Sequence, residues 1–193
     1  MNFWELASFA KSKNLDNYLL LSQAYDQNVL IESNMKFLKS FINCFKTKKN
    51  IKSQLFQDVF ASFIIGNEFD KTFLEFGATD GFDLSNSYML ENFENWSGVL
   101  SEPSPQWHES LKKNRNKTKI ITKCIWSESG KKLDFFMSDV GVLSTIKDFV
   151  ESDKNSMPGN TIERNKGGKI ISVGTISLND VIKEYFNNIS PSY

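Results

Sequence analysis

A short apolar run that ends in a glycine-rich turn constrains the fold of this chain more than any other feature. Thr72-Phe-Leu-Glu-Phe76 has the length and composition of a buried strand, and it leads directly into Gly77-Ala-Thr-Asp-Gly81. Glycine at position 77 removes the Cβ that would keep a ligand away from the backbone, and Gly81 allows the chain to turn into a helix. In doubly wound α/β proteins such a turn lies at the carboxyl end of a strand, where ligands bind.

Strand-like and helix-like segments alternate after this turn. We expect strands over Ser97–Ser101 and Lys119–Cys124, and helices between the strands over Leu84–Phe93 and Trp107–Leu111. This alternation favours a parallel sheet with helices on both of its faces. Two hairpin-like strands and a final helix are expected over Lys132–Met137, Lys169–Val173 and Leu178–Phe186. The predicted fold class is therefore α/β, with a Rossmann-like sheet.

The beginning of the chain differs from the rest because it contains no strand-like run. Apolar residues at helical spacing predict three helices, over residues 3–10, 18–24 and 35–45. A run of lysines from Lys46 to Lys52 follows, and such charge runs are typical of a solvated connector. We therefore expect a helical N-terminal segment over residues 1–50 and an α/β domain over residues 51–193. An apolar helical stripe from Phe56 to Phe63 opens that domain.

The charges of the chain balance, with 23 Lys and Arg residues against 23 Asp and Glu residues. A chain without net charge lacks the bulk attraction of a non-specific nucleic-acid binder, so we expect no nucleic-acid partner. The first residues do not resemble an export signal, and no apolar run is long enough to cross a membrane. We therefore expect a cytoplasmic protein without a membrane span.

Residues that bind metals or titrate near neutral pH are few. The chain has two cysteines, Cys44 and Cys124, and one histidine, His108. A zinc site would need both thiols or carboxylates from distant segments, so we expect no metal site and no disulfide framework. Histidine is the usual general base at neutral pH, which makes His108 a candidate for a catalytic residue. The simpler alternative is a surface histidine beside Trp107.

Two acidic residues lie where a ligand would meet the sheet. Glu75 comes two residues before Gly77, and a carboxylate there suits a cationic amino group, such as that of S-adenosylmethionine, and no phosphate. Glu102 follows the second expected strand, where an acid accepts hydrogen bonds from both ribose hydroxyls of an adenosine. Each also has a simpler interpretation, as an acid before a glycine turn or a surface acid before a proline.

The spacing of the glycines bears on a second class of enzyme. A dinucleotide-binding turn has the pattern G-x-G-x-x-G, whose amides and helix N-terminus face a pyrophosphate. The turn from Gly77 to Gly81 lacks the middle glycine of that pattern. A nicotinamide-dependent oxidoreductase is therefore disfavoured.

Short motifs follow one another along the chain in a recognisable order. They are Ser53-Gln54, Gln57-Asp58, Glu75-x-Gly-Ala-x-Asp-Gly81, Ser85-Asn86-Ser87, Trp96-Ser97-Gly98 and Glu102-Pro103-Ser104-Pro105. This succession resembles that of the FkbM-type methyltransferases, over about Ser53 to about Tyr185. The resemblance implies a class I, S-adenosylmethionine-dependent enzyme that methylates a hydroxyl of a saccharide, glycan precursor or secondary metabolite.

The resemblance also implies a cofactor site, residue by residue. It assigns the methionine end of the cofactor to Glu75, Gly77, Ala78, Asp80 and Gly81, and the ribose to Glu102. It places Cys124 and Ile125, at the end of the third expected strand, beside the adenine. It places Ser85 and Asn86 near the cofactor or the acceptor. Thr79 stands where the family commonly has Asn, so the side-chain contact made there in the family is not expected here.

The end of the chain departs from the family. In FkbM-type enzymes the helix that matches Leu178–Phe186 is followed by a strand with an Asp-x-Glu-Gly motif and by further strands of the sheet. This chain ends at Tyr193, where that strand would begin, so we expect an incomplete sheet and a truncated sequence. The expected function is S-adenosylmethionine-dependent O-methylation of a small-molecule or glycan acceptor. The alternative is a non-catalytic interaction module that keeps the fold.

Overall fold

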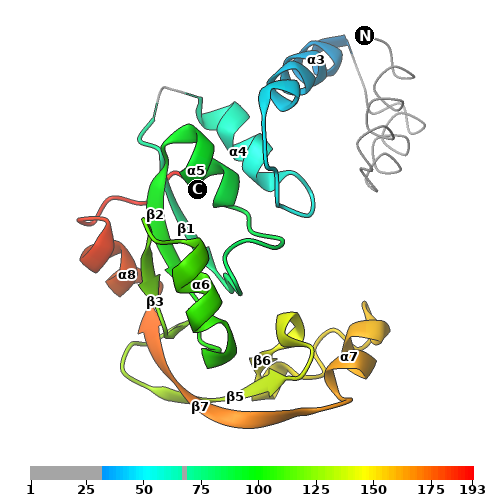
Figure 1. Cartoon of the computed structure of the whole chain (residues 1–193), viewed down its shortest axis with the longest axis vertical. Helices are drawn as coiled ribbons and strands as arrows, with labels where there is room; N and C mark the ends of the chain where they lie inside the picture. Colours follow the sequence, from blue (N-terminus) through cyan, green and yellow to red (C-terminus); the bar gives the residue numbers. More distant parts are fainter. Residues whose placement is uncertain (1–31, 67–68) are drawn as a thin grey trace.

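The computed structural model describes residues 32–66 and 69–193 (Figure 1). The helices expected over residues 3–10 and 18–24 lie outside the described residues. The third expected helix is α3 (Glu32–Thr47), and the apolar stripe after it forms α4 (Gln57–Ile65), which ends at Gly66. No helix within these described ranges is long and apolar enough to cross a membrane.

The two helices pack against each other through aromatic rings. The ring of Phe41 on α3 meets those of Phe60 and Phe63 on α4 edge to face, with centroids 6.0 and 5.5 Å apart. Lys48, just after α3, donates to Ser62 on α4 and forms an ion pair with Glu94, and its side chain is only 14% exposed. The expectation of a solvated lysine connector is therefore wrong for Lys48, because this side chain joins α3 to the elements that follow.

A three-stranded parallel sheet forms the centre of the described structure. Its strands are β1 (Thr72–Phe76), β2 (Ser97–Ser101) and β3 (Lys119–Ile121), in the order β1-β2-β3. The connections contain α5 (Tyr88–Glu94) between the first two strands, and the short helices η1 (Pro105–Trp107) and α6 (His108–Asn114) between the second and third. The predicted α/β fold with a parallel sheet is confirmed.

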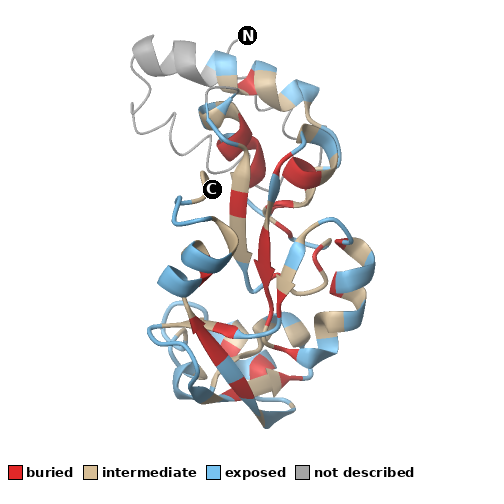
Figure 2. Ribbon diagram, turned by 90° about the vertical axis from the view of Figure 1, so that its left-hand side faces the viewer, coloured by how far each residue is buried: buried red, intermediate tan, exposed pale blue. Residues whose placement is uncertain are grey.

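Helices cover both faces of this sheet, as the alternation of segments predicted. On one face the buried side chains of α4, α5 and α6 pack against Phe73 and Leu100. On the other face Val99 and Ile121 pack against Val181 of α8 (Leu178–Tyr185). In Figure 2 the buried residues of this sheet lie mostly on β2, whose last three residues are all buried.

A second, mixed sheet lies below the first in Figure 1 and has the strand order β4-β7-β5-β6. Its long central pair is β5 (Lys132–Ser138) and β7 (Gly168–Ser177), which run antiparallel as the hairpin-like pattern predicted. β4 (Cys124–Trp126) pairs in parallel with β7, and β6 (Thr145–Ile146) borders β5. The segment around β6 also contains η2 (Gly141–Leu143), η3 (Lys147–Phe149) and α7 (Pro158–Arg164).

The expectation of a single strand over Lys119–Cys124 is wrong. β3 ends at Ile121, and Cys124 begins β4, which belongs to the other sheet. The physical reason lies at Lys123, whose carbonyl accepts a hydrogen bond from the Ser101 hydroxyl at 2.7 Å and so lies next to the end of β2. From there the chain continues along β7 and leaves the parallel sheet.

The last residue of the chain lies beside β1. The amide of Tyr193 donates to the Thr72 carbonyl at 3.1 Å, and its carbonyl accepts from the Leu74 amide at 2.8 Å. This is the hydrogen-bond pattern of a parallel ladder. β1 therefore has backbone partners on both sides, with β2 on one side and Tyr193 on the other.

Candidate ligand-binding site

The turn after β1 depends on left-handed backbone conformations. Gly77 has φ +72°, Thr79 +49° and Gly81 +73°. A Cβ on Gly81 would lie 2.5 Å from the Leu111 side chain and 2.6 Å from that of Arg115, so Gly81 permits close packing on α6. A Cβ on Gly77 would have no atom within 4 Å. The backbone at Gly77 therefore faces open space, and its contact with a ligand stays a prediction.

Glu102 follows β2 directly and turns its carboxylate toward this loop. Oε2 accepts from the Thr79 amide at 2.8 Å, and Oε1 accepts from the Ser104 amide at 2.7 Å. Burial raises the pKa of the Glu102 carboxyl, against the lowering effects of the two amides and of nearby His108. A carboxylate has about four lone-pair positions, so each oxygen retains the capacity to accept a further hydrogen bond.

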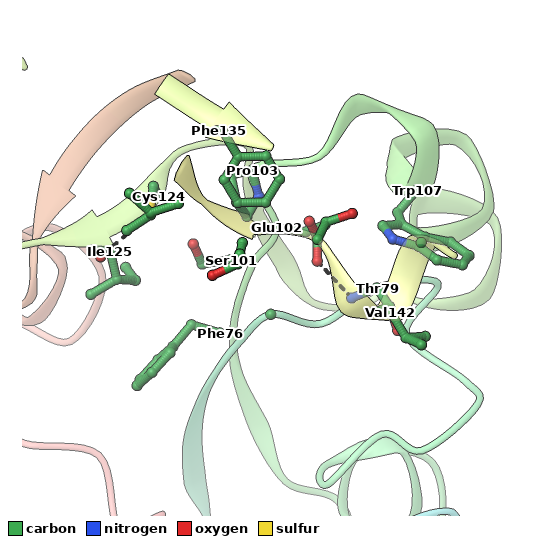
Figure 3. Close-up of a pocket in the computed structure, with 15 residues that line it drawn as sticks. Phe76, Thr79, Ser101, Glu102, Pro103, Trp107, Cys124, Ile125, Phe135 and Val142 are labelled. Carbon is green, nitrogen blue, oxygen red and sulfur yellow. Dashed lines mark hydrogen bonds between the residues drawn. The ribbon is translucent and has the colours of Figure 1, made fainter. Parts of the chain in front are cut away.

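These groups border a cavity of about 230 Å³ at the carboxyl ends of β1 and β2 (Figure 3). Among the predicted site residues, its lining contains Gly77, Glu102, Cys124 and Ile125. Sites that enclose a whole drug-sized ligand usually measure about 300–1,000 Å³. The cavity therefore suits one part of such a ligand. Among the described residues that line it, Glu102 alone carries a charge.

The wall around Cys124 is apolar. The side chains of Cys124 and Phe135 are buried in the core between β4 and the β5–β7 pair, and Ile125 lies beside Cys124 in Figure 3. Burial and the Glu102 carboxylate both raise the pKa of the Cys124 thiol. The thiol is therefore neutral and contributes surface without charge. Cys124 and Ile125 reach this position from β4 and not, as expected, from the end of the third strand.

Glu75 does not line the cavity, although the sequence placed it at the ligand. Its carboxylate accepts from the Ser85 hydroxyl at 3.0 Å, from the Asn86 amide at 2.9 Å and from the Ser87 hydroxyl. The Arg115 guanidinium lies 3.9 Å away. Glu75, Ser85 and Asn86 are therefore brought together, but in a network that fixes the loop before α5.

The remaining residues of the predicted methionine site shape the turn. Oδ1 of Asp80 accepts from the amides of Phe82 and Asp83, at 2.9 and 3.0 Å. Ala78 is buried in the core under the sheet, and Gly81 packs against α6. Their direct contact with a cofactor stays a prediction, because none of the three lines the cavity.

His108 lies behind Glu102, at the start of α6. Its Nε2 is 2.8 Å from the backbone carbonyl oxygen of Glu102. Since a carbonyl only accepts, Nε2 carries the proton of this hydrogen bond. The ring therefore holds the backbone of Glu102, and it does not line the cavity. A role for His108 as general base stays a prediction.

Sequence reasoning missed one wall of the cavity. Residues 141–146, between β5 and β6, contribute Gly141, Val142, Ser144, Thr145 and Ile146. They lie in a stretch without periodicity or motif, and no signal in the sequence points to them. Trp107, which meets this wall at Gly141, had a signal, because tryptophan is enriched at binding surfaces. Within the described residues no three His, Cys, Asp or Glu side chains form a group that could hold a metal ion.

Comparison of the chain with protein-family models, with curated proteins and with solved structures finds no match. The resemblance to FkbM-type methyltransferases therefore rests on the motifs of the sequence.

Proposed function

We propose that the chain is an S-adenosylmethionine-dependent methyltransferase domain of the FkbM type, with a Rossmann-like sheet. The observation that carries the proposal is the buried Glu102 carboxylate, which lies in the cavity at the end of β2, 2.8 Å from the Thr79 amide of the turn after β1. An acid that is held in this place, beside a glycine turn, suits the ribose of an adenosine.

The residues of the cavity fit this cofactor in three respects. Each Glu102 oxygen already accepts one backbone hydrogen bond and retains room for one ribose hydroxyl. Gly77 leaves the backbone open to a ligand. Cys124, Ile125 and Phe135 offer an uncharged surface to an adenine ring. When bound, S-adenosylmethionine supplies an electrophilic methyl group to a nucleophilic oxygen.

The charge of the cavity argues against a phosphate-bearing ligand. In the part of the lining that the structure describes, residues 32–66 and 69–193, Glu102 is the only charged side chain, and no lysine, arginine or histidine accompanies it. A pyrophosphate near this carboxylate would meet a like charge without a compensating cation. This supports a nucleoside with a diol and a cationic sulfonium over a nicotinamide dinucleotide.

Glu75 has an indirect role in this proposal. Its carboxylate is used by Ser85, Asn86 and Ser87, so it shapes the loop that leads to α5. The same observation favours a second candidate, an interaction module that keeps the fold without the chemistry, because a residue that the family uses at the cofactor is here engaged internally. The acceptor, a hydroxyl of a saccharide, glycan precursor or secondary metabolite, follows from the resemblance.

Titration of S-adenosylhomocysteine into the folded protein, followed by calorimetry, tests the proposal. Wild type should bind, and Glu102→Ala should bind at least about tenfold more weakly, since hydrogen bonds to a charged group contribute about 1.5–3 kcal/mol. Glu109→Ala is the matched control, because Glu109 is an exposed acid on α6. Absent or equally weak binding by wild type and Glu102→Ala, with native circular dichroism, would favour the interaction module.

A further inference from the structure

The wall of the cavity formed by residues 141–146 belongs to a larger segment whose parts are joined by internal hydrogen bonds. We call residues 139–165, between β5 and β7, the wall segment. It contains η2, β6, η3 and α7. Its cavity-lining side chains carry no charge: Val142 and Ile146 are apolar, and Ser144 and Thr145 offer hydroxyls. The group of a ligand that binds against this wall is therefore uncharged.

The wall segment contacts the opposite side of the cavity at η1. Gly141 lies against the Trp107 ring so closely that a Cβ at this position would overlap the ring atom Cζ2. Beside this contact, Nε2 of Gln106 donates to the Ser144 hydroxyl at 3.2 Å. The distance between the two sides of the cavity is therefore set where Gly141 meets Trp107.

One buried side chain joins the parts of the wall segment. Arg164 is 6% exposed, and its Nε donates to the Leu143 carbonyl at the end of η2 at 2.8 Å. A second nitrogen donates to the Val150 carbonyl after η3. The guanidinium also binds both carboxylate oxygens of Asp153, at 2.9 and 2.8 Å. These hydrogen bonds hold the pKa of the Asp153 carboxyl well below its ordinary value.

The backbone of Arg164 completes the arrangement. Its carbonyl accepts from the Ser138 hydroxyl at 3.3 Å, at the end of β5 where the wall segment begins. Arg164 thus contacts η2, which lines the cavity, and also β5, the strand from which the wall segment begins. Arg164 itself does not line the cavity.

We propose that Arg164 is a positioning residue for the ligand site, which acts through the Leu143 carbonyl to hold the wall of residues 141–146 against Trp107. The affinity of the cavity for its ligand then depends on a side chain that does not touch the ligand. The choice of S-adenosylhomocysteine as the probe rests on the proposed function. The position of the wall relative to Trp107 does not depend on which ligand the cavity binds. A lysine cannot replace Arg164, because an ammonium lacks the planar fork that reaches two carbonyls and a carboxylate together.

Fluorine NMR of fluorotryptophan-labelled protein tests the position of the wall without a ligand. Arg164→Lys should shift the resonance of Trp107, assigned by Trp107→Phe, and leave that of buried Trp96 in place. Lys147→Ala is the matched control, because it removes an exposed ion pair with Asp134 from the same segment. It should leave both resonances unchanged. A Trp107 resonance that is identical in wild type and Arg164→Lys would overturn the proposal.

Gly141→Ala provides a second route that leaves Arg164 intact. The added methyl group separates the wall from Trp107 directly, so it should move the same resonance even if Arg164→Lys does not fold. Both variants should also weaken S-adenosylhomocysteine by about tenfold at an unchanged stoichiometry. If wild type does not bind this probe, the proposed function fails, and the Trp107 resonances still decide whether Arg164 positions the wall. Wild-type affinity in both folded variants would refute the positioning role.

Discussion

Arg115 and Glu91 form an ion pair in the interior, with side chains 0% and 3% exposed. The same guanidinium donates to the hydroxyls of Ser85 and Ser87, at 3.1 and 2.9 Å, and to the Gly81 carbonyl at 3.2 Å. It therefore joins the end of α6 to α5 and to the loop that precedes α5. Since that loop also binds Glu75 of β1, the ion pair stabilises the backbone on both sides of the turn from Gly77 to Gly81.

Arg115→Met should be strongly destabilising. The change leaves Glu91 buried without its cation and removes the donors to two buried hydroxyls. Breaking a buried ion pair by removal of one partner costs about 3–5 kcal/mol. The free energy of unfolding, measured with urea, is expected to fall by that amount. Lys113→Met, on the exposed side of α6, should change it by less than about 0.5 kcal/mol. Equal effects of the two substitutions would contradict a special role for the buried pair.

Gly77 and Gly81 have nearly the same φ, at +72° and +73°, but different surroundings. Gly77→Ala should therefore cost only the left-handed strain of about 1–2 kcal/mol. Gly81→Ala adds an overlap with Leu111 and Arg115, and overpacking costs about 1–3 kcal/mol more. Urea unfolding of the two variants side by side measures the difference. If Gly77→Ala were the more destabilising change, the turn would not have the open face described here.

Asp58 predicts a pH dependence of stability. The residue is 0% exposed, and its Oδ2 has no hydrogen-bond partner among the described residues. Burial raises the pKa of this carboxyl, against hydrogen bonds from Ser53 and Val59. Because the folded-state pKa is raised, the contribution of Asp58 to stability is full below its unfolded-state pKa and is lost as the pH rises through the folded-state value.

The matched substitution is Asp58→Asn, which keeps the shape and removes the titration. Wild type should lose stability relative to Asp58→Asn when the pH is raised from about 4 to about 8. Urea unfolding of both proteins across this range measures the difference between their free energies of unfolding. The other titrating groups are the same in both proteins, so their contributions cancel in this difference. A constant difference, or one that changes in the opposite direction, would show that Asp58 does not have a raised pKa.

The elements with a clear pattern were predictable, and those set by tertiary pairing were not. β1 and β2 lie where the apolar runs predicted, because a short apolar run before a turn has few other buried conformations. The break between Ile121 and Cys124 was not predictable, since it depends on Ser101 and β7, which are distant in sequence. Helix α5 begins at Tyr88, later than expected, because Ser85 and Ser87 bind Glu75.

The candidate site divides in the same way. Gly77 and Glu102 follow strands directly, and a residue at a strand end has a position that the strand itself determines. Spacing and the family resemblance both place Glu75 at the ligand. The direction of its side chain depends instead on hydrogen bonds from Ser85, Asn86 and Ser87, in a loop that a sequence pattern does not orient. The wall of residues 141–146 depends on contacts with Arg164 and Trp107 that leave no local pattern.

Tyr193 predicts a late step in an alkaline titration. Burial, together with the negative charges of Glu75 and Asp58, raises the pKa of its phenol to about 12. In a titration of tyrosinate absorbance, one of the five tyrosines should therefore ionise near pH 12, well above the ordinary value of about 10. Tyr193→Phe should lack this ionisation near pH 12. Circular dichroism at each pH checks that the protein stays folded. The pH dependence of the free energy of unfolding gives a second measurement. Because the folded-state pKa is raised, the stability that Tyr193 contributes below pH 10 is lost as the pH approaches about 12. If the absorbance missing from Tyr193→Phe lies near pH 10 instead, the phenol is exposed and the pairing of Tyr193 with β1 does not persist in solution.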